Sequence, residues 1–446
     1  MARSDLRAGS DLTAPHLKDP HLIDPGLIDP GLIDTDLTDA SLFADGPPME
    51  VFRSLRHHDP VHWNPPPPEW AGCELDGAGF WSLTRASDIA AVATDLEGFS
   101  VGRGWYLNHE TDSPVPLEAL QSMLTGMQPP QHTKFRGLLS KAFVPNTVNR
   151  LEDLIRLRMT RIIDKVIEAG ACDMAHDIAV PLPIQVIGDL LGFPEEAEEQ
   201  VVSWSLRLAA TQDPEARGGG VEQSLAALQE IVGYAYEIAE ARRVEPRDDL
   251  LTRLAVAEID GERLDAVGLG AFVLQLIVAG NETSRNSLSI GVKTLMEHRD
   301  QWDLLVGSPG LVPKAVEEIL RWLAPVMYMR RTATRDVEIG GKQVRAGDKV
   351  VQWLVGSNFD PELNPDPERF DITRESVRHQ TFGGGGRRFC LGAGLARLEL
   401  RVALEELTRR MPGVAADGEP RWLRSNFFGG LLRLPVSYPT GQREAR

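Results

Sequence analysis

The sequence predicts a mainly α-helical single domain with a minor β-region. Helical hydrophobic periodicity dominates residues 130–325, with amphipathic stretches at 146–169, 183–192, 197–211 and 221–242. Short strand patterns occur within 79–101 and again after Pro325. No internal linker rich in Gly, Ser or Pro divides the chain, so we expect most of its 446 residues to share one core.

The N-terminus carries a degenerate five-residue repeat. Between residues 16 and 45 a Leu and an Asp recur at fixed phase, as in HLKDP, HLIDP and GLIDP. A period of five matches neither helix nor strand, and three units end in Pro. We therefore expect residues 1–40 to be a low-complexity, flexible leader, residues 41–440 to be the folded domain, and 441–446 to be a tail.

The longest helix is expected over 265–298. At about 34 residues it would be roughly 50 Å long. Its first half, LDAVGLGAFVLQLIVAG, is apolar on all sides, which predicts a helix that runs through the core. Short strands should follow Pro325, and a final helix should run from about Gly394 to Arg410.

Composition excludes several classes of protein. Lys plus Arg is 47 against 65 for Asp plus Glu, a net charge of −18, which argues against broad binding to nucleic acid or anionic lipid. Three widely spaced cysteines (Cys73, Cys172 and Cys390) suggest neither a disulfide framework nor a zinc site. We expect no stable membrane insertion, since no run was found to approach about 18 apolar residues, and no signal peptide. A cytoplasmic monomer is the expectation.

One cysteine follows a glycine-rich loop, in Thr381–Arg397 (TFGGGGRRFCLGAGLAR). Four consecutive glycines allow a tight turn and a close approach to a flat ligand. Cys390 lies just before a helix, where the N–H groups of Leu391 and Gly392 would point at the sulfur and stabilise a thiolate. The alternative is a structural cysteine beside a phosphate loop, but G-x-x-x-x-G-K-S/T and a βαβ-type G-x-G-x-x-G are both absent.

This loop resembles the cysteine-ligand loop of the cytochromes P450. The resemblance implies that Cys390 is the axial ligand of a haem b iron and that Arg388 binds a haem propionate. The common pattern places Phe seven residues before the cysteine; here Gly383 holds that position and Phe382 lies eight before. Phe382 is accordingly the ring expected to shield the thiolate, with Gly383 and Gly392 close to the haem.

The long helix carries Ala279-Gly280-Asn281-Glu282-Thr283. Oxygen activation needs controlled proton delivery, for which an acid beside a hydroxyl at a helix bulge is suited; a kinked helix with a surface Glu-Thr pair is the alternative. The segment is similar to the P450 distal-helix motif, which implies Glu282 and Thr283 as the catalytic acid–alcohol pair and Gly280 as the residue that permits the kink. Helical spacing then places Ala279 against the haem and Gln275 on the same face, where it contacts either substrate or a backbone group.

Further motifs occur in the order of the family. Glu318 and Arg321 form an E-x-x-R pair on one helical face, and the resemblance makes Arg369 the third member of a structural network. His132 and Arg136 share a face of a helix that follows two prolines; a solvated pair is the alternative to the propionate-binding role that the family implies. Arg331 fits the remaining propionate position.

Pocket walls are predicted by the same alignment, although each residue could equally be core. They are Trp105, Tyr106, Leu107, Gln275, Ala279, Val326, Met327, Met329, Phe427 and Phe428. A Met-rich, aromatic wall suits a bulky apolar substrate.

The resemblance spans roughly residues 40–440 and implies a haem-thiolate monooxygenase with the reaction RH + O2 + 2e− + 2H+ to ROH + H2O. Electrons would come from a ferredoxin and its reductase. The expected substrate is a steroid, branched lipid or terpenoid; tailoring of a polyketide, aromatic or peptide-derived natural product is the alternative. A haem sensor or carrier and a plain helical scaffold with a structural cysteine are the non-enzyme alternatives.

Overall fold

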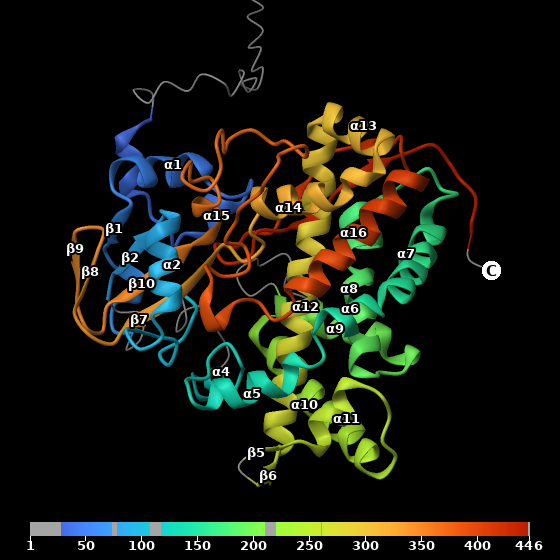
Figure 1. Cartoon of the computed structure of the whole chain (residues 1–446), viewed down its shortest axis with the longest axis horizontal. Coiled ribbons are helices and arrows are strands. Elements are labelled where there is room, and N and C mark those ends of the chain that lie inside the picture. The colour runs from blue at the N-terminus through green and yellow to red at the C-terminus, as the bar shows by residue number, and fades with distance from the viewer. Residues whose placement is uncertain (1–27, 74–77, 108–116, 210–219, 260, 445–446) are drawn as a thin grey trace, which may run out of the picture.

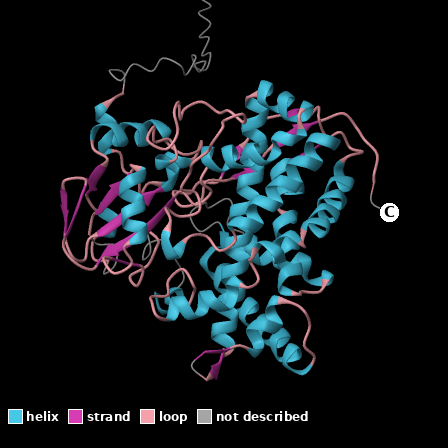
Figure 2. Ribbon diagram, in the orientation of Figure 1, coloured by secondary structure: helices cyan, strands magenta, loops and turns pink. Residues whose placement is uncertain are grey.

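The computed structural model describes residues 28–73, 78–107, 117–209, 220–259 and 261–444, and its architecture is mainly helical with small sheets, as predicted. Most strands gather on one side of the molecule, and short strand pairs lie among the helices that make up the rest (Figure 2). The helices are α1 Met49–His58, α2 Ala86–Thr94, α4 Leu117–Gln121, α5 Gln131–Ser140, α6 Pro145–Asn149, α7 Glu152–Val166, α8 Pro181–Leu191, α9 Glu198–Ala209, α10 Gly220–Val244, α11 Leu250–Val256, α12 Ala266–Glu297, α13 Arg299–Gly307, α14 Val312–Trp322, α15 Leu354–Ser357 and α16 Ala393–Arg410.

The main sheet joins two ends of the sequence. Its order is β1-β2-β10-β7-β3, with β2 and β10 parallel and the other pairs antiparallel. In the β10–β7 register Gln352 lies opposite Met329 and Val350 opposite Arg331, so these four side chains share one face. The strands of this sheet are β1 Val61–Asn64, β2 Phe80–Leu83, β3 Phe99–Ser100, β7 Tyr328–Ala333 and β10 Lys349–Trp353.

Four smaller sheets complete the strands. One has the order β11-β14-β4, and three are hairpin-like pairs: β5 with β6, β8 with β9, and β12 with β13. Their bounds are β4 Ala171–Asp173, β5 Glu258–Ile259, β6 Glu262–Arg263, β8 Val337–Ile339, β9 Lys342–Val344, β11 Ala415–Ala416, β12 Arg421–Trp422, β13 Leu431–Arg433 and β14 Pro435–Ser437.

Helix α12 is the central element, packed between α8, α9, α10, α14 and α16 (Figure 1). Asp265 caps it by accepting a hydrogen bond from the Gly268 N–H at 2.7 Å. By length and composition α12 is apolar enough to cross a membrane, although the sequence was expected to contain no such segment. In the structure 56% of its most apolar 18-residue stretch is buried inside the protein. Burial of this kind is what a core helix shows.

The expected flexible leader is wrong for residues 28–40. Short 3-10 helices form at Pro30–Asp34 and Ala40–Phe43, and the Leu37 side chain between them is fully buried. Asn426, near the final hairpin, donates from Nδ2 to the Leu37 carbonyl oxygen at 3.1 Å. The Leu of the repeat therefore serves here as a core residue; residues 1–27 lie outside the described part of the chain.

Candidate active site

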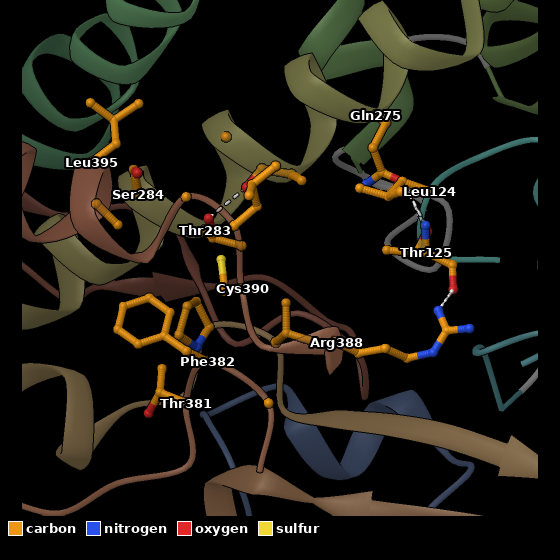
Figure 3. A pocket seen from close by; sticks show the side chains of 18 of the residues that line it. Leu124, Thr125, Gln275, Thr283, Ser284, Thr381, Phe382, Arg388, Cys390 and Leu395 are labelled. Atoms are coloured by element: carbon orange, nitrogen blue, oxygen red, sulfur yellow. Dashed lines mark hydrogen bonds between the residues drawn. The ribbon is translucent and has the colours of Figure 1, made fainter. Parts of the chain in front are cut away.

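A cavity lies where α12, α5, the β7–β10 sheet and the start of α16 meet the cysteine loop (Figure 3). All ten residues predicted to bind the cofactor line it: His132, Arg136, Ala279, Gly280, Arg331, Phe382, Gly383, Arg388, Cys390 and Gly392. The sequence segments that contribute them are separated by up to about 250 residues, and the fold brings them to one place.

The cysteine thiol faces this cavity. Cys390 has accessible surface, but that surface opens into the cavity, since the residue is one of its lining residues and protein surrounds the thiol. Burial raises the pKa of the thiol, while N–H groups of Gly392 and Ala393 and the guanidinium of Arg136 act to lower it. The main-chain N–H of Cys390 donates to the Phe382 carbonyl at 2.9 Å and closes the loop. A positively charged metal ion would tip this balance to the thiolate.

The four glycines of the loop are required by its backbone. Gly383, Gly384, Gly385 and Gly386 have φ of +96°, +54°, +110° and +71°, a region that other residues rarely adopt. A Cβ on Gly386 would also lie 3.0 Å from the Ala93 carbonyl oxygen on α2. The loop therefore packs directly on α2 while it presents the cysteine.

Four basic side chains line the same cavity without an acidic partner among the described residues. Among the described residues, none of His132, Arg136, Arg331 and Arg388 makes an ion pair, and His132 Nδ1, Arg331 Nε and Arg388 Nε are buried without a hydrogen-bond partner. Burial and then Arg388 lower the pKa of Arg331 to about 9. Burial, Arg388 and Arg136 lower the pKa of His132 to about 4. Such a cluster of unpaired donors predicts a bound group with negative charge.

These features define a class of site. A cysteine sulfur facing a cavity, three guanidinium groups and an imidazole that lack acidic partners, and apolar walls from Leu276, Ala279 and Leu395 fit a haem. Haem supplies the iron, the flat apolar ring and two propionates. Among the described residues, no group of three or more His, Cys, Asp or Glu side chains is arranged to hold a metal ion. The protein is therefore a haem-thiolate protein.

Comparisons with known proteins agree with this class. The family pattern of cytochrome P450 matches residues 310–435. The chain is 37% identical to a steroid C26-monooxygenase of Rhodococcus jostii, covering 90% of this chain and 83% of that one. It is 38% identical to a methyl-branched lipid omega-hydroxylase of Mycobacterium tuberculosis, covering 87% and 90%. A solved cytochrome P450 of Mycobacterium marinum, in complex with pseudoionone, superposes with a TM-score of 0.84 at 35% identity, covering 90% of this chain and 98% of that one.

The chain belongs to the cytochrome P450 family, and it is a monooxygenase with haem b as its cofactor.

Thr283 and Glu282 point in different directions from α12. Thr283 lines the cavity, and its hydroxyl donates to the Ala279 carbonyl at 2.6 Å (Figure 3). Glu282 is fully buried outside the cavity and pairs with Arg285 at 2.6 Å; burial raises its pKa in spite of that partner. Helix α12 is continuous through Gly280, where the kink remains a prediction. A Cβ at Gly280 would lie 2.6 Å from Ile187 Cδ1 on α8, so a glycine allows the two helices to pack closely.

The buried network around Glu318 corrects one prediction. Arg321 binds both carboxylate oxygens of Glu318, at 2.7 and 2.8 Å, with both side chains fully buried. The third member is Arg374, whose Nε lies 3.2 Å from Glu318 Oε1 and whose side chain is 10% exposed. The side chain of Arg369 is instead 50% exposed and faces Asp371 at 3.4 Å. Only the Arg369 carbonyl joins the network, as an acceptor for Arg321 and Arg374.

Six of the predicted pocket residues do not line the described cavity. Gln275, Ala279, Val326 and Met329 do line it. The other six lie in the packing behind the wall, where Tyr106 stacks on Phe427 at 4.1 Å and Phe428 bridges to Val326. They are Trp105, Tyr106, Leu107, Met327, Phe427 and Phe428.

Among the cavity residues that were not anticipated are two buried polar side chains, Glu399 and Gln352. Glu399 on α16 is buried, which raises its pKa to about 7 against a hydrogen bond from Ser284. Gln352 on β10 lines the cavity with Nε2 buried and unpaired among the described residues. The sequence did contain a signal for Glu399. It is an acidic residue nine positions after Cys390, on a helix whose other face is apolar.

Proposed function

We propose that this enzyme hydroxylates a methyl-branched aliphatic chain of a steroid or lipid. The observation that carries the proposal is the wall of the cavity, where Leu276, Ala279, Val326 and Met329 are apolar and Thr283 contributes a hydroxyl. Relatives whose names specify a steroid C26-monooxygenase and a methyl-branched lipid omega-hydroxylase support this substrate class. Both names refer to apolar substrates. An apolar wall accommodates an aliphatic chain of such a substrate without polar partners.

Each residue has a role in this proposal. Bound haem supplies the oxygen-activating chemistry. Cys390 holds the iron as a thiolate stabilised by the N–H groups of Gly392 and Ala393. His132, Arg136, Arg331 and Arg388 bind the propionates, and the Phe382 ring shields the sulfur. The Thr283 hydroxyl donates a hydrogen bond to the Ala279 carbonyl oxygen, so the hydroxyl oxygen is free to accept a hydrogen bond from the cavity side.

Glu282 is assigned to proton supply. The Glu282 carboxyl group faces away from the cavity and pairs with Arg285. In this proposal Glu282 delivers a proton to the cavity only when the Glu282–Arg285 ion pair breaks. Burial raises the pKa of Glu282, whereas the Arg285 guanidinium acts to lower it.

Electrons are proposed to come from a ferredoxin and its reductase in the cytoplasm. The enzyme is proposed to be monomeric, with a haem domain that adds residues 28–40 to the expected 41–440. Arg387, exposed beside the cysteine loop, would face an acidic ferredoxin.

The test is a visible-spectrum titration of the purified haem protein with steroids, methyl-branched lipids, terpenoids and aromatic natural products. A low- to high-spin shift with the first two classes, followed by a hydroxylated chain in the mass spectrum of the product, would support the proposal. A shift only with compact polar aromatics would replace it with natural-product tailoring.

A further inference from the structure

The amide of Gln275 has a fixed orientation in the cavity. Its Oε1 accepts hydrogen bonds from the Thr125 hydroxyl at 2.8 Å and from the Thr125 main-chain N–H at 3.5 Å (Figure 3). A main-chain N–H can only donate, so the atom that faces Thr125 is the oxygen. The NH2 group is therefore the end of the amide left for the cavity, and no described residue accepts a hydrogen bond from it.

Thr125 is itself held in place from the opposite side. Arg388 donates to the Thr125 carbonyl at 3.3 Å and to the Met127 carbonyl at 2.5 Å. A chain of hydrogen bonds thus runs from a haem-side arginine through Thr125 to Gln275. The amide is oriented before any substrate enters, which lowers the entropic cost of using it.

The surroundings of this NH2 group are poor in acceptors. Leu124, Leu276 and Ala279 are apolar members of the same cavity wall, and the Thr283 oxygen, which can accept, lies eight residues along α12 from Gln275. A donor in apolar surroundings favours a ligand that brings an oxygen atom to it, and disfavours the analogue without one.

The spacing along α12 sets where that oxygen lies. Gln275 precedes Thr283 by eight residues, which is about 12 Å of helix at 1.5 Å per residue. We propose that Gln275 is a specificity-determining residue, which binds a ketone or hydroxyl oxygen of the substrate at about this distance from the carbon that is oxidised. Thr125 is the positioning residue that orients its amide. The inference rests on the proposed hydroxylation of a branched chain. It adds that this substrate carries an oxygen atom at its other end.

The test compares two probes in the haem-loaded enzyme: the branched ketone hexahydropseudoionone and the branched alkane that lacks its carbonyl oxygen. Dissociation constants are read from the spin-state shift in wild type and in Gln275→Leu. The dissociation constant of the alkane divided by that of the ketone should be smaller in the variant than in wild type. The decrease should be by a factor of about two to ten, as expected for the loss of one hydrogen bond. The alkane serves as the internal control, because it makes no use of the amide.

Two variants of Thr125 separate orientation from packing. Thr125→Val removes the hydroxyl and should lower the ratio in the same direction as Gln275→Leu, whereas Thr125→Ser keeps the hydroxyl and should retain the wild-type ratio. An unchanged ratio in Gln275→Leu would overturn the assignment and leave the proposed function intact. A normal haem spectrum with no shift from either probe would refute the proposed substrate class, and the assignment of Gln275 with it.

Discussion

Replacing Arg374 with Ala should destabilise the fold far more than replacing Arg369. The Arg374 side chain donates to Glu318 Oε1 at 3.2 Å and to the carbonyls of Pro365, Asp366 and Arg369 at 2.7, 2.6 and 2.6 Å. The bond to the buried carboxylate is worth about 1.5–3 kcal/mol, and the carbonyl bonds nearer the surface add about 1 kcal/mol together, because water replaces them in part. The expected loss is therefore about 2.5–4 kcal/mol.

Arg369→Ala is the matched control. It removes an arginine five residues away whose side chain is half exposed and whose ion pair with Asp371 is 3.4 Å long, so the loss should stay below about 1 kcal/mol. The Arg369 carbonyl that serves the network remains. Urea unfolding of the two variants, followed by far-ultraviolet circular dichroism, gives the comparison. Equal losses, or a larger loss in Arg369→Ala, would refute the network as described.

Three further predictions concern the cavity and the loop. Arg388→Leu should weaken haem binding about tenfold to a hundredfold by removing a charged donor to a propionate, measured as haem transfer to apomyoglobin; transfer at the wild-type rate would contradict this. Gly386→Ala should lower the free energy of unfolding in urea by more than about 2 kcal/mol, because Gly386 has a φ of +71° and lies against α2. Gly233→Ala is the control: Gly233 is exposed on α10 with open space at its Cβ, so the free energy of unfolding should rise by up to about 1 kcal/mol. Burial raises the pKa of Glu399 to about 7, so the folded state binds the proton more tightly than the unfolded state, and stability should fall by about 3 kcal/mol as the pH rises from about 4.5 to above 7. The Glu399→Gln variant should lack this fall, and a pH profile identical to wild type would count against the buried acid.

The central helix and the cysteine loop could be predicted from the sequence because their signals are local. An apolar stretch on all faces gives a core helix, and α12 spans Ala266–Glu297 where 265–298 was expected. Four adjacent glycines before a cysteine have one simple explanation, and all four adopt positive φ. The ten residues predicted to bind the cofactor all line one cavity, and each was predicted from a motif of fixed spacing.

Side-chain direction was harder to predict than position in the chain. Arg369 and Arg374 lie in the same loop, and only the fold decides which of them turns inward to Glu318. Glu282 and Thr283 are neighbours, yet consecutive helical residues point about 100° apart, so only Thr283 reaches the cavity. Helical periodicity does contain that information, and it was applied to Gln275 and Ala279 but not to Glu282.

Long-range packing accounts for the remaining differences. The rings of Tyr106 and Phe428 both pack against the Phe427 ring, the first tilted and the second edge-on. An aromatic side chain that faces a pocket has the same sequence signature as one that faces the core. The buried position of Leu37 depends on Asn426, a residue 389 positions later in the chain. No local pattern contains a contact of that range.

The most direct test of the site is the carbon monoxide difference spectrum of the reduced protein, recorded for wild type, Cys390→His and Cys172→Ser. A haem held by the Cys390 thiolate predicts the red-shifted Soret band of a thiolate-ligated carbon monoxide complex in wild type and in Cys172→Ser, whose cysteine lies on β4 far from the cavity. Cys390→His should bind haem and show the shorter-wavelength band of imidazole ligation. Retention of the thiolate band in Cys390→His, or its absence from wild type, would contradict the assignment of Cys390 as the ligand.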